Sequence, residues 1–198
     1  MISLPGARIR ARGRARSRAR IVLLGALLAL PWLASTTAGA AGEAETRPWG
    51  TVRAVSSGTH LLVVSPDRGQ ILVRLVGVEL PEAPRPGNGV PLDGQPFGEQ
   101  AANYVRDLLL EKQVQLTTYG TDRAGRTLAV VWLGDINVNL TLVKEGLAWV
   151  DPALTVAKVR APLEVAERQA RVGKYGLWSL PEPEPPWKYR KRHRLVLQ

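Results

Sequence analysis

The chain has 198 residues and a formal net charge of +10 at pH 7, but this charge is unevenly spread. Seven of the 27 Lys and Arg side chains lie in residues 1–40, which contain no acid, so the rest has 20 basic against 17 acidic side chains. This balance excludes a wide positive field of the kind that drives nonspecific nucleic-acid binding. The absence of cysteine excludes disulfides and thiolate metal sites, and two histidines argue against a multi-histidine zinc site.

The N-terminus has the pattern of a secretory signal. Arginines alternate with other residues from Arg8 to Arg20, and an apolar run from Ile21 to Ala34 leads to small residues that end at Ala40. The run is shorter than the roughly 20 residues that span a membrane. We therefore predict cleavage after Ala40 and an extracytoplasmic protein, periplasmic or secreted, without a stable membrane span. An uncleaved signal would instead act as a membrane anchor.

The remaining residues predict one domain with its own core. Residues 41–49 are expected to form a short linker. Segments rich in β-branched residues predict five strands, at 50–55, 59–65, 70–78, 113–119 and 127–133. Apolar residues at helical spacing predict three helices: Gly98 to about Glu111, a helix capped by Asn139 that ends near Gly146, and Pro162 to Gly173. Five strands with interspersed helices predict an α+β fold, mainly β, built on a small closed barrel.

Two further segments are expected to lie outside this barrel. Residues 83–96 are rich in proline and glycine and predict an exposed loop. Residues 181–186 predict a semi-rigid linker to a basic tail, for which a solvated, disordered end is the favoured interpretation. Within that tail, Trp187 and Tyr189 would either stack on nucleic-acid bases or pack back on the barrel.

Three side chains far apart in the sequence suit phosphodiester cleavage: Arg74, Glu82 and Arg126. Attack on phosphorus adds negative charge to the phosphate oxygens, and a guanidinium group holds such oxygens through paired hydrogen bonds. A carboxylate can take the proton from the attacking water. Structural roles are also open to these residues, because Arg74 could pair with Glu79 or Glu82 and Arg126 could close the turn begun at Asp122.

Five motifs in one order resemble the staphylococcal nuclease (thermonuclease) family over about residues 50–178, with 179–198 as a proline-rich linker and basic tail. They are Arg74 to Glu82, Pro96 to Ala101, Asp122 to Arg126, Gly146 to Val150 and Gly176 to Trp178. The resemblance implies a five-stranded OB-type barrel with about three helices, and calcium-dependent cleavage of DNA and RNA. It also implies that Arg74 contacts the phosphate, Glu82 acts as general base and Arg126 stabilises the transition state.

The metal site that the resemblance implies is weakened in this sequence. The family pattern Asp-Gly-Asp-Thr falls on Ser57 to His60, so Thr59 stands where a calcium-ligating aspartate is expected. Glu79 matches the other ligating aspartate, and Leu80 matches a residue that offers its backbone carbonyl. A hard cation prefers carboxylates, so calcium binding is expected to be weak. His60 beside a strand is more often half-exposed than a metal ligand.

Two functions from different classes are the main candidates, and a purely structural role in the cell envelope also stays open. The first is an exported thermonuclease-like enzyme that hydrolyses DNA or RNA with metal assistance from a depleted calcium site. The second is a noncatalytic OB-fold module that binds nucleic acid or another polyanion in the cell envelope. Thr59 separates them, because an enzyme needs another ligand there and a binding module needs none. The enzyme is favoured, since Glu82 would repel phosphate in a pure binder. The sequence leaves the oligomeric state open.

Overall fold

The structure is a computed structural model that describes residues 46–86 and 93–193. The chain divides into two compact units, Met1–Ala38 and Gly39–Gln198, and all described residues belong to the second. The predicted signal at 1–40 and the first part of the predicted linker therefore lie outside the described residues. No helix in the described ranges is long and apolar enough to cross a membrane.

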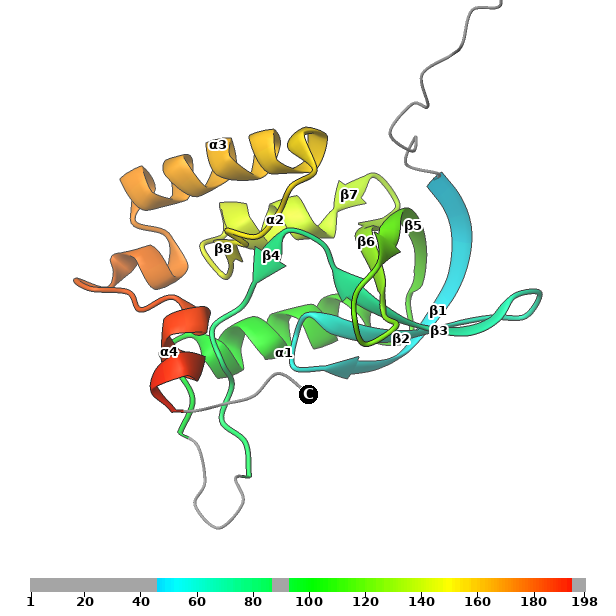
Figure 1. Cartoon of the computed structure of the whole chain (residues 1–198), viewed down its shortest axis with the longest axis horizontal. Coiled ribbons are helices and arrows are strands. Elements are labelled where there is room, and N and C mark those ends of the chain that lie inside the picture. Colours follow the sequence, from blue (N-terminus) through cyan, green and yellow to red (C-terminus); the bar gives the residue numbers. More distant parts are fainter. Residues whose placement is uncertain (1–45, 87–92, 194–198) are drawn as a thin grey trace, which may run out of the picture. The chain divides into compact units, whose positions relative to one another are not determined.

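Five strands form a closed barrel, as the sequence predicts (Figure 1). They are β1 (Thr46–Ser56), β2 (His60–Ser65), β3 (Gly69–Leu75), β5 (Gln113–Thr121) and β6 (Thr127–Leu133). Antiparallel pairs run in the order β3-β2-β1-β5-β6, and a parallel pairing between β3 and β6 closes the ring. The short strand β7 (Ile136–Asn137) extends the sheet beyond β6. β1 begins at Thr46, so the last residues of the predicted linker are strand.

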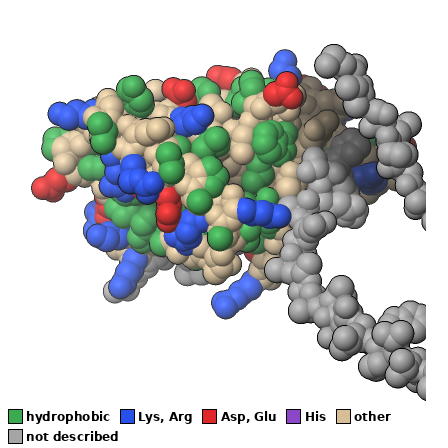
Figure 2. All heavy atoms as spheres, turned by 90° about the horizontal axis from the view of Figure 1, so that it is seen from above, with side chains coloured by type: hydrophobic (Ala, Val, Ile, Leu, Met, Phe, Trp, Pro, Cys, Tyr) green, Lys and Arg blue, Asp and Glu red, His purple; other side chains and the backbone are tan. Residues whose placement is uncertain are grey.

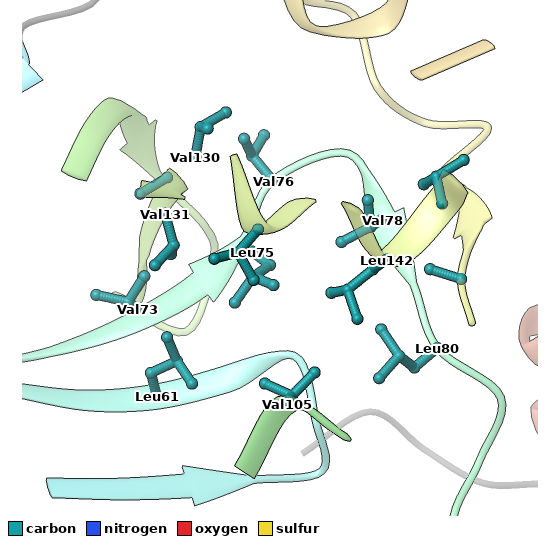
Figure 3. Packing of buried hydrophobic residues seen from close by; sticks show 14 of the residues in the cluster. Leu61, Val73, Leu75, Val76, Val78, Leu80, Val105, Val130, Val131 and Leu142 are labelled. Carbon is teal, nitrogen blue, oxygen red and sulfur yellow. The ribbon is translucent and has the colours of Figure 1, made fainter. Parts of the chain in front are cut away.

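The core lies inside the barrel and continues under the helices (Figure 3). Burial alternates along β2, where Leu61 and Val63 point inward, because successive side chains of a strand face opposite sides of the sheet. Helix α1 (Gly98–Leu109) turns Ala101, Val105 and Leu109 toward the same core. The predicted helical spacing therefore identified the buried face, although α1 ends two residues before Glu111.

Four helices and one 3-10 turn are described where about three helices were expected. Besides α1 they are α2 (Val138–Lys144), α3 (Ala157–Gly173), the turn η1 (Gly176–Ser179) and α4 (Pro186–Arg192). Helix α3 begins at Ala157 rather than at Pro162, which lies inside it. Burial of Val159 on the face that also carries Leu163 and Ala166 explains the extension, since this packing offsets the hydrogen bond that proline cannot donate.

The predicted cap of α2 is wrong by two residues. Asn137 caps the helix, and its side chain accepts a hydrogen bond from the backbone N of Leu140 at 3.0 Å. Asn139 is instead buried, with 1% of its surface exposed. Its amide accepts from Val131 N at 3.0 Å and donates to Val76 O at 2.8 Å, so it joins β6 to the turn that follows β3.

The described part of the tail, up to residue 193, does not form the solvated end that the sequence favours. Residues 186–192 form α4, and Tyr189 is only 6% exposed. The Trp187 ring lies edge-on to that of Trp149, with centroids 5.7 Å apart. Trp149 and Trp178 are core aromatics, with ring centroids 4.4 Å apart. Aromatic burial therefore docks the tail on the domain, which charge patterning alone did not predict.

Candidate functional site

The first part of the site is built where β3 ends. Arg74 is the penultimate residue of β3, and the following turn leads into β4 (Val78–Glu79), which pairs with β8 (Trp149–Val150). This pairing sets Glu79 opposite Trp149, and Asp151 follows β8 directly. Nη2 of Arg74 donates to Oε1 of Glu79 and lies 3.8 Å from Oδ2 of Asp151. One of the two structural pairings considered for Arg74 is therefore present.

Glu82 lies in the loop after β4 and is held there by its backbone. Its N donates to Oε1 of Gln95 at 3.0 Å, and its carbonyl accepts from Gln95 N at 2.7 Å. Gly98 closes this loop from the other side, because a Cβ on Gly98 would stand 2.0 Å from the Glu82 carbonyl oxygen. Gln95 belongs to the loop at 83–96 that was predicted to be exposed, but it is buried, with 8% of its surface exposed. It fixes the position of the Glu82 backbone.

An arginine from the tail joins the two glutamates. Nη1 of Arg190 lies 3.0 Å from Oε2 of Glu79 and 2.9 Å from Oε1 of Glu82. The two carboxylates are thus within about 6 Å of each other, where their repulsion would cost about 3 kcal/mol at an effective dielectric of 20. Burial alone would lower the pKa of Arg190, but the bonds and charges of Glu82 and Glu79 outweigh it and raise that pKa. The guanidinium is therefore a permanent positive charge at this point.

Arg126 forms the second part of the site. It precedes β6 directly, and Thr127 of β6 pairs with Val73, the neighbour of Arg74. Its Nε donates to Oδ2 of Asp122 at 2.7 Å, and its backbone N donates to Oδ1 at 3.0 Å. Burial raises the pKa of Asp122, but the hydrogen bonds from Arg126 and Ala124 outweigh it and hold that pKa below its usual value. The predicted closure of this turn by Arg126 is present.

His60 lies between the two arginines. In the β2–β3 register His60 is opposite Arg74, and Nη1 of Arg126 lies 2.9 Å from its Nε2. Since the guanidinium can only donate, Nε2 accepts, and Nδ1 carries the proton that it donates to Oγ of Ser57 at 2.9 Å. Burial first, and then the charges of Arg126 and Arg74, lower the pKa of His60 to about 4. The ring is therefore neutral near pH 7 and positions Arg126.

The residues predicted to bind calcium do not offer the free carboxylate oxygens that this ion prefers. Both carboxylate oxygens of Glu79 already accept from guanidinium groups, and Thr59 brings a neutral oxygen. Leu80 is a core residue whose side chain packs on the turn at Gly58. Over the described ranges, no three His, Cys, Asp or Glu side chains are clustered so that they could hold a metal ion. Calcium thus stays an expectation from the resemblance, and the donor set argues against it.

The arrangement keeps the atoms that phosphodiester chemistry requires. The contacts of Arg74 use Nη2, and those of Arg126 use Nε and Nη1. Within the described residues, Nη1 of Arg74, Nη2 of Arg126 and Oε2 of Glu82 make no hydrogen bond. Among the described residues, each of the three predicted side chains therefore keeps a polar atom without a hydrogen bond. Neighbours hold Nη2 of Arg74, Nε and Nη1 of Arg126, and Oε1 of Glu82.

Sequence reasoning missed four residues that build this site: Arg190, Gln95, Asp151 and His60 in its contact with Arg126. Gln95 precedes the Pro96-Phe97-Gly98 motif, and a glutamine inside a proline- and glycine-rich loop was a weak signal. Arg190 lies in the tail, three residues after Trp187. That spacing places both on one face of a helix, and it was the available signal for docking.

Comparison with known proteins gives consistent matches. A family model described as "Staphylococcal nuclease homologue" matches residues 72–180. The chain is 35% identical over 120 residues to a thermonuclease of Staphylococcus intermedius, covering 60% of this chain and 69% of that protein. It is 34% identical over 134 residues to a micrococcal nuclease of Shigella flexneri, covering 63% and 71%. A staphylococcal nuclease domain-containing protein 1 of Drosophila melanogaster is 33% identical over 65% of this chain, which spans 14% of that protein.

Proposed function

Because the chain belongs to the staphylococcal nuclease family, we propose that it hydrolyses phosphodiester bonds of DNA or RNA. The observation that carries this proposal is the way in which neighbouring residues hold the backbone and the carboxylate of Glu82. Its backbone is fixed by Gln95, one carboxylate oxygen is bound by Arg190, and Oε2 makes no hydrogen bond among the described residues. A carboxylate held in this way is suited to accept a proton from a water molecule.

The proposed reaction uses three side chains. Oε2 of Glu82 takes a proton from water as the water oxygen forms a bond to phosphorus. Arg74 and Arg126 donate hydrogen bonds to the phosphate oxygens, on which charge accumulates in the transition state. The bond from phosphorus to the leaving oxygen then breaks, that oxygen takes a proton from solvent water, and Glu82 returns to solvent the proton that it accepted. The free nitrogens of both arginines supply the donors that this step needs.

Two further features belong to the same proposal. The calcium site is depleted, since Thr59 replaces a carboxylate and the oxygens of Glu79 are bound to Arg74 and Arg190. The protein is exported by the signal at 1–40 and acts outside the cytoplasm.

Figure 2 shows basic side chains scattered among acidic and apolar ones on the face that it displays. Substrate binding is therefore expected to depend on the local arginines rather than on a broad field.

A second function, a noncatalytic OB-fold module that binds nucleic acid or another polyanion, is favoured by one observation. Three of the four carboxylate oxygens of Glu79 and Glu82 are bound to arginine, which cancels the negative charge that would repel a phosphate. Glu82 therefore repels a bound phosphate less than its charge alone would imply. The two functions differ in whether Glu82 acts as a base.

Cleavage of labelled single-stranded DNA and RNA tests the proposal. The chain from residue 41 onward retains nearly all of the second compact unit, and it is assayed with calcium, magnesium, manganese or a chelator. We expect Glu82→Gln to lower the rate by about 10²–10⁴-fold, the usual contribution of a general base. Arg74→Ala and Arg126→Ala are expected to reduce the rate as well. Cleavage no faster than in Glu82→Gln under every condition would contradict hydrolysis and leave the binding module.

A further inference from the structure

Helix α4 holds one of its arginines, Arg190, in a fixed position. Arg190 is three residues after Trp187 and adjacent to Tyr189, and both aromatic side chains are packed against the domain. The backbone before α4 is held as well, because Nε2 of Gln95 donates to the carbonyl of Glu184 at 2.8 Å. Three independent contacts therefore fix where the Arg190 guanidinium lies.

Arg192, which lies in the same helix and also forms an ion pair, differs from Arg190 in its exposure and in its partner. The side chain of Arg192 is 60% exposed and pairs with Glu184 in the same tail. The side chain of Arg190 is 12% exposed and reaches Glu79 and Glu82, more than a hundred residues earlier in the sequence. A buried guanidinium loses its hydration, and its two carboxylate partners compensate for that loss. Arg190 is thus part of the site, although it lies beyond the residues that the family model matches.

The position of Arg190 has a clear electrostatic effect. Glu79 and Glu82 are the carboxylates at which a divalent cation was expected, and Nη1 of Arg190 now lies within 3.0 Å of both. A cation that binds the same oxygens would have to displace the guanidinium. With Arg190 in place, its positive charge partly balances the negative charges of Glu79 and Glu82. A phosphate can therefore approach Arg74 with less repulsion.

We propose that Arg190 is the resident cation of this site: it replaces a divalent ion at Glu79 and Glu82 and excludes such an ion while α4 is docked. The inference concerns the charge of the site, and its catalytic consequence, cleavage without a metal ion, rests on the proposed function. Arg190 is therefore a charge-compensating residue that acts through the two glutamates.

Calorimetric titration with CaCl₂ and with MnCl₂ tests the exclusion without any activity measurement. The unaltered chain from residue 41 onward is expected to show no saturable binding up to about 1 mM, the weak end for extracellular calcium modules. Arg190→Gln frees Oε2 of Glu79 and Oε1 of Glu82 and is expected to bind calcium at least tenfold more tightly. Arg190→Lys keeps a positive charge and is expected to exclude the ion as the unaltered chain does.

The matched control is Arg192→Gln, which removes an arginine from the same helix but leaves Glu79 and Glu82 paired. It is expected to titrate like the unaltered chain. Thermal unfolding with and without CaCl₂ shows whether Arg190→Gln is folded, since a bound ion raises its Tm by mass action. Saturable calcium binding by the unaltered chain, or no gain in Arg190→Gln that unfolds cooperatively, would overturn the proposal.

A cleavage assay in chelator separates this inference from the proposed function. Retained cleavage in chelator by the unaltered chain, together with a new requirement for metal in Arg190→Gln, would support both. If the titrations give the expected result and no variant cleaves, the resident cation stands and hydrolysis fails. If Arg190→Gln cleaves faster than the unaltered chain in chelator, Arg190 blocks the site and the proposed compensating role is wrong.

Discussion

Gln95 holds Glu82 from both sides, since its side-chain oxygen accepts from Glu82 N and its own backbone N donates to Glu82 O. Its side-chain nitrogen also binds the carbonyl of Glu184 in the tail. One buried amide therefore aligns the proposed base and anchors the segment that carries Arg190. A local shift at residue 95 would change the geometry of Glu82 and of α4 together.

Replacement of Gln95 by alanine is expected to weaken both the fold and the site. It leaves the partly buried N–H of Glu82 without its acceptor, and an unpaired group of this kind costs about 1–3 kcal/mol. We expect a loss of that size in urea unfolding and a several-fold lower cleavage rate. Gln100→Ala, at an exposed position of α1, is the control. Unchanged stability in Gln95→Ala would show that the hydrogen bond to Glu82 contributes nothing.

The barrel could be predicted because its signals are local. The β-branched strands follow from neighbouring residues, and the face of α1 follows from the spacing of Ala101 and Val105. The pairings of Arg74 with Glu79 and of Arg126 with Asp122 were foreseen as alternatives, because each pair is separated by only a few residues.

The docking of α4 could not be predicted in the same way. A helix of seven residues with several basic side chains has no strong local signal, and its position depends on Trp149, 38 residues before Trp187. The buried role of Asn139 has the same cause, since its partners Val76 and Val131 belong to other elements. Long-range packing decides these features, and one sequence does not display it.

Asn139 offers a test of how the fold supports the site. Its amide connects β6, which Arg126 precedes, to the turn between Arg74 and Glu79. Asn139→Ala leaves Val131 N and Val76 O without this partner, so we expect a loss of about 2–4 kcal/mol in the free energy of unfolding. Asn137→Ala removes a helix cap and is expected to cost about 1 kcal/mol. Equal losses in the two variants would contradict the bridging role.

Gly98 tests the close contact behind Glu82. A methyl group at this position would stand 2.0 Å from the Glu82 carbonyl oxygen, so the loop or the start of α1 has to move. We expect Gly98→Ala to destabilise the protein by about 1–3 kcal/mol, the usual cost of overpacking, although alanine favours helix. The change should also lower the cleavage rate, because it displaces Glu82. A variant as stable and as active as the unaltered chain would show that this contact is loose.

His60 predicts a pH dependence of stability. Its pKa is about 4 in the folded protein, because of burial and the charges of Arg126 and Arg74, against 6.5 for the free group. Between these values the unfolded chain binds more protons at this ring than the folded protein does, so stability rises with pH. The contribution is fully present above pH 6.5 and is lost as the pH falls toward 4. Allowing for partial exposure and screening, we expect it to be about 1 kcal/mol.

Urea unfolding of the unaltered chain and of His60→Gln, measured at several pH values between 4 and 7, isolates this contribution. The difference in unfolding free energy between the two proteins should change across this window, with the unaltered chain losing more stability toward acid. His193→Gln removes the other histidine, at an exposed position, and gives the comparison for loss of an imidazole elsewhere. Parallel curves for the unaltered chain and His60→Gln would mean that His60 is not held neutral between the two arginines.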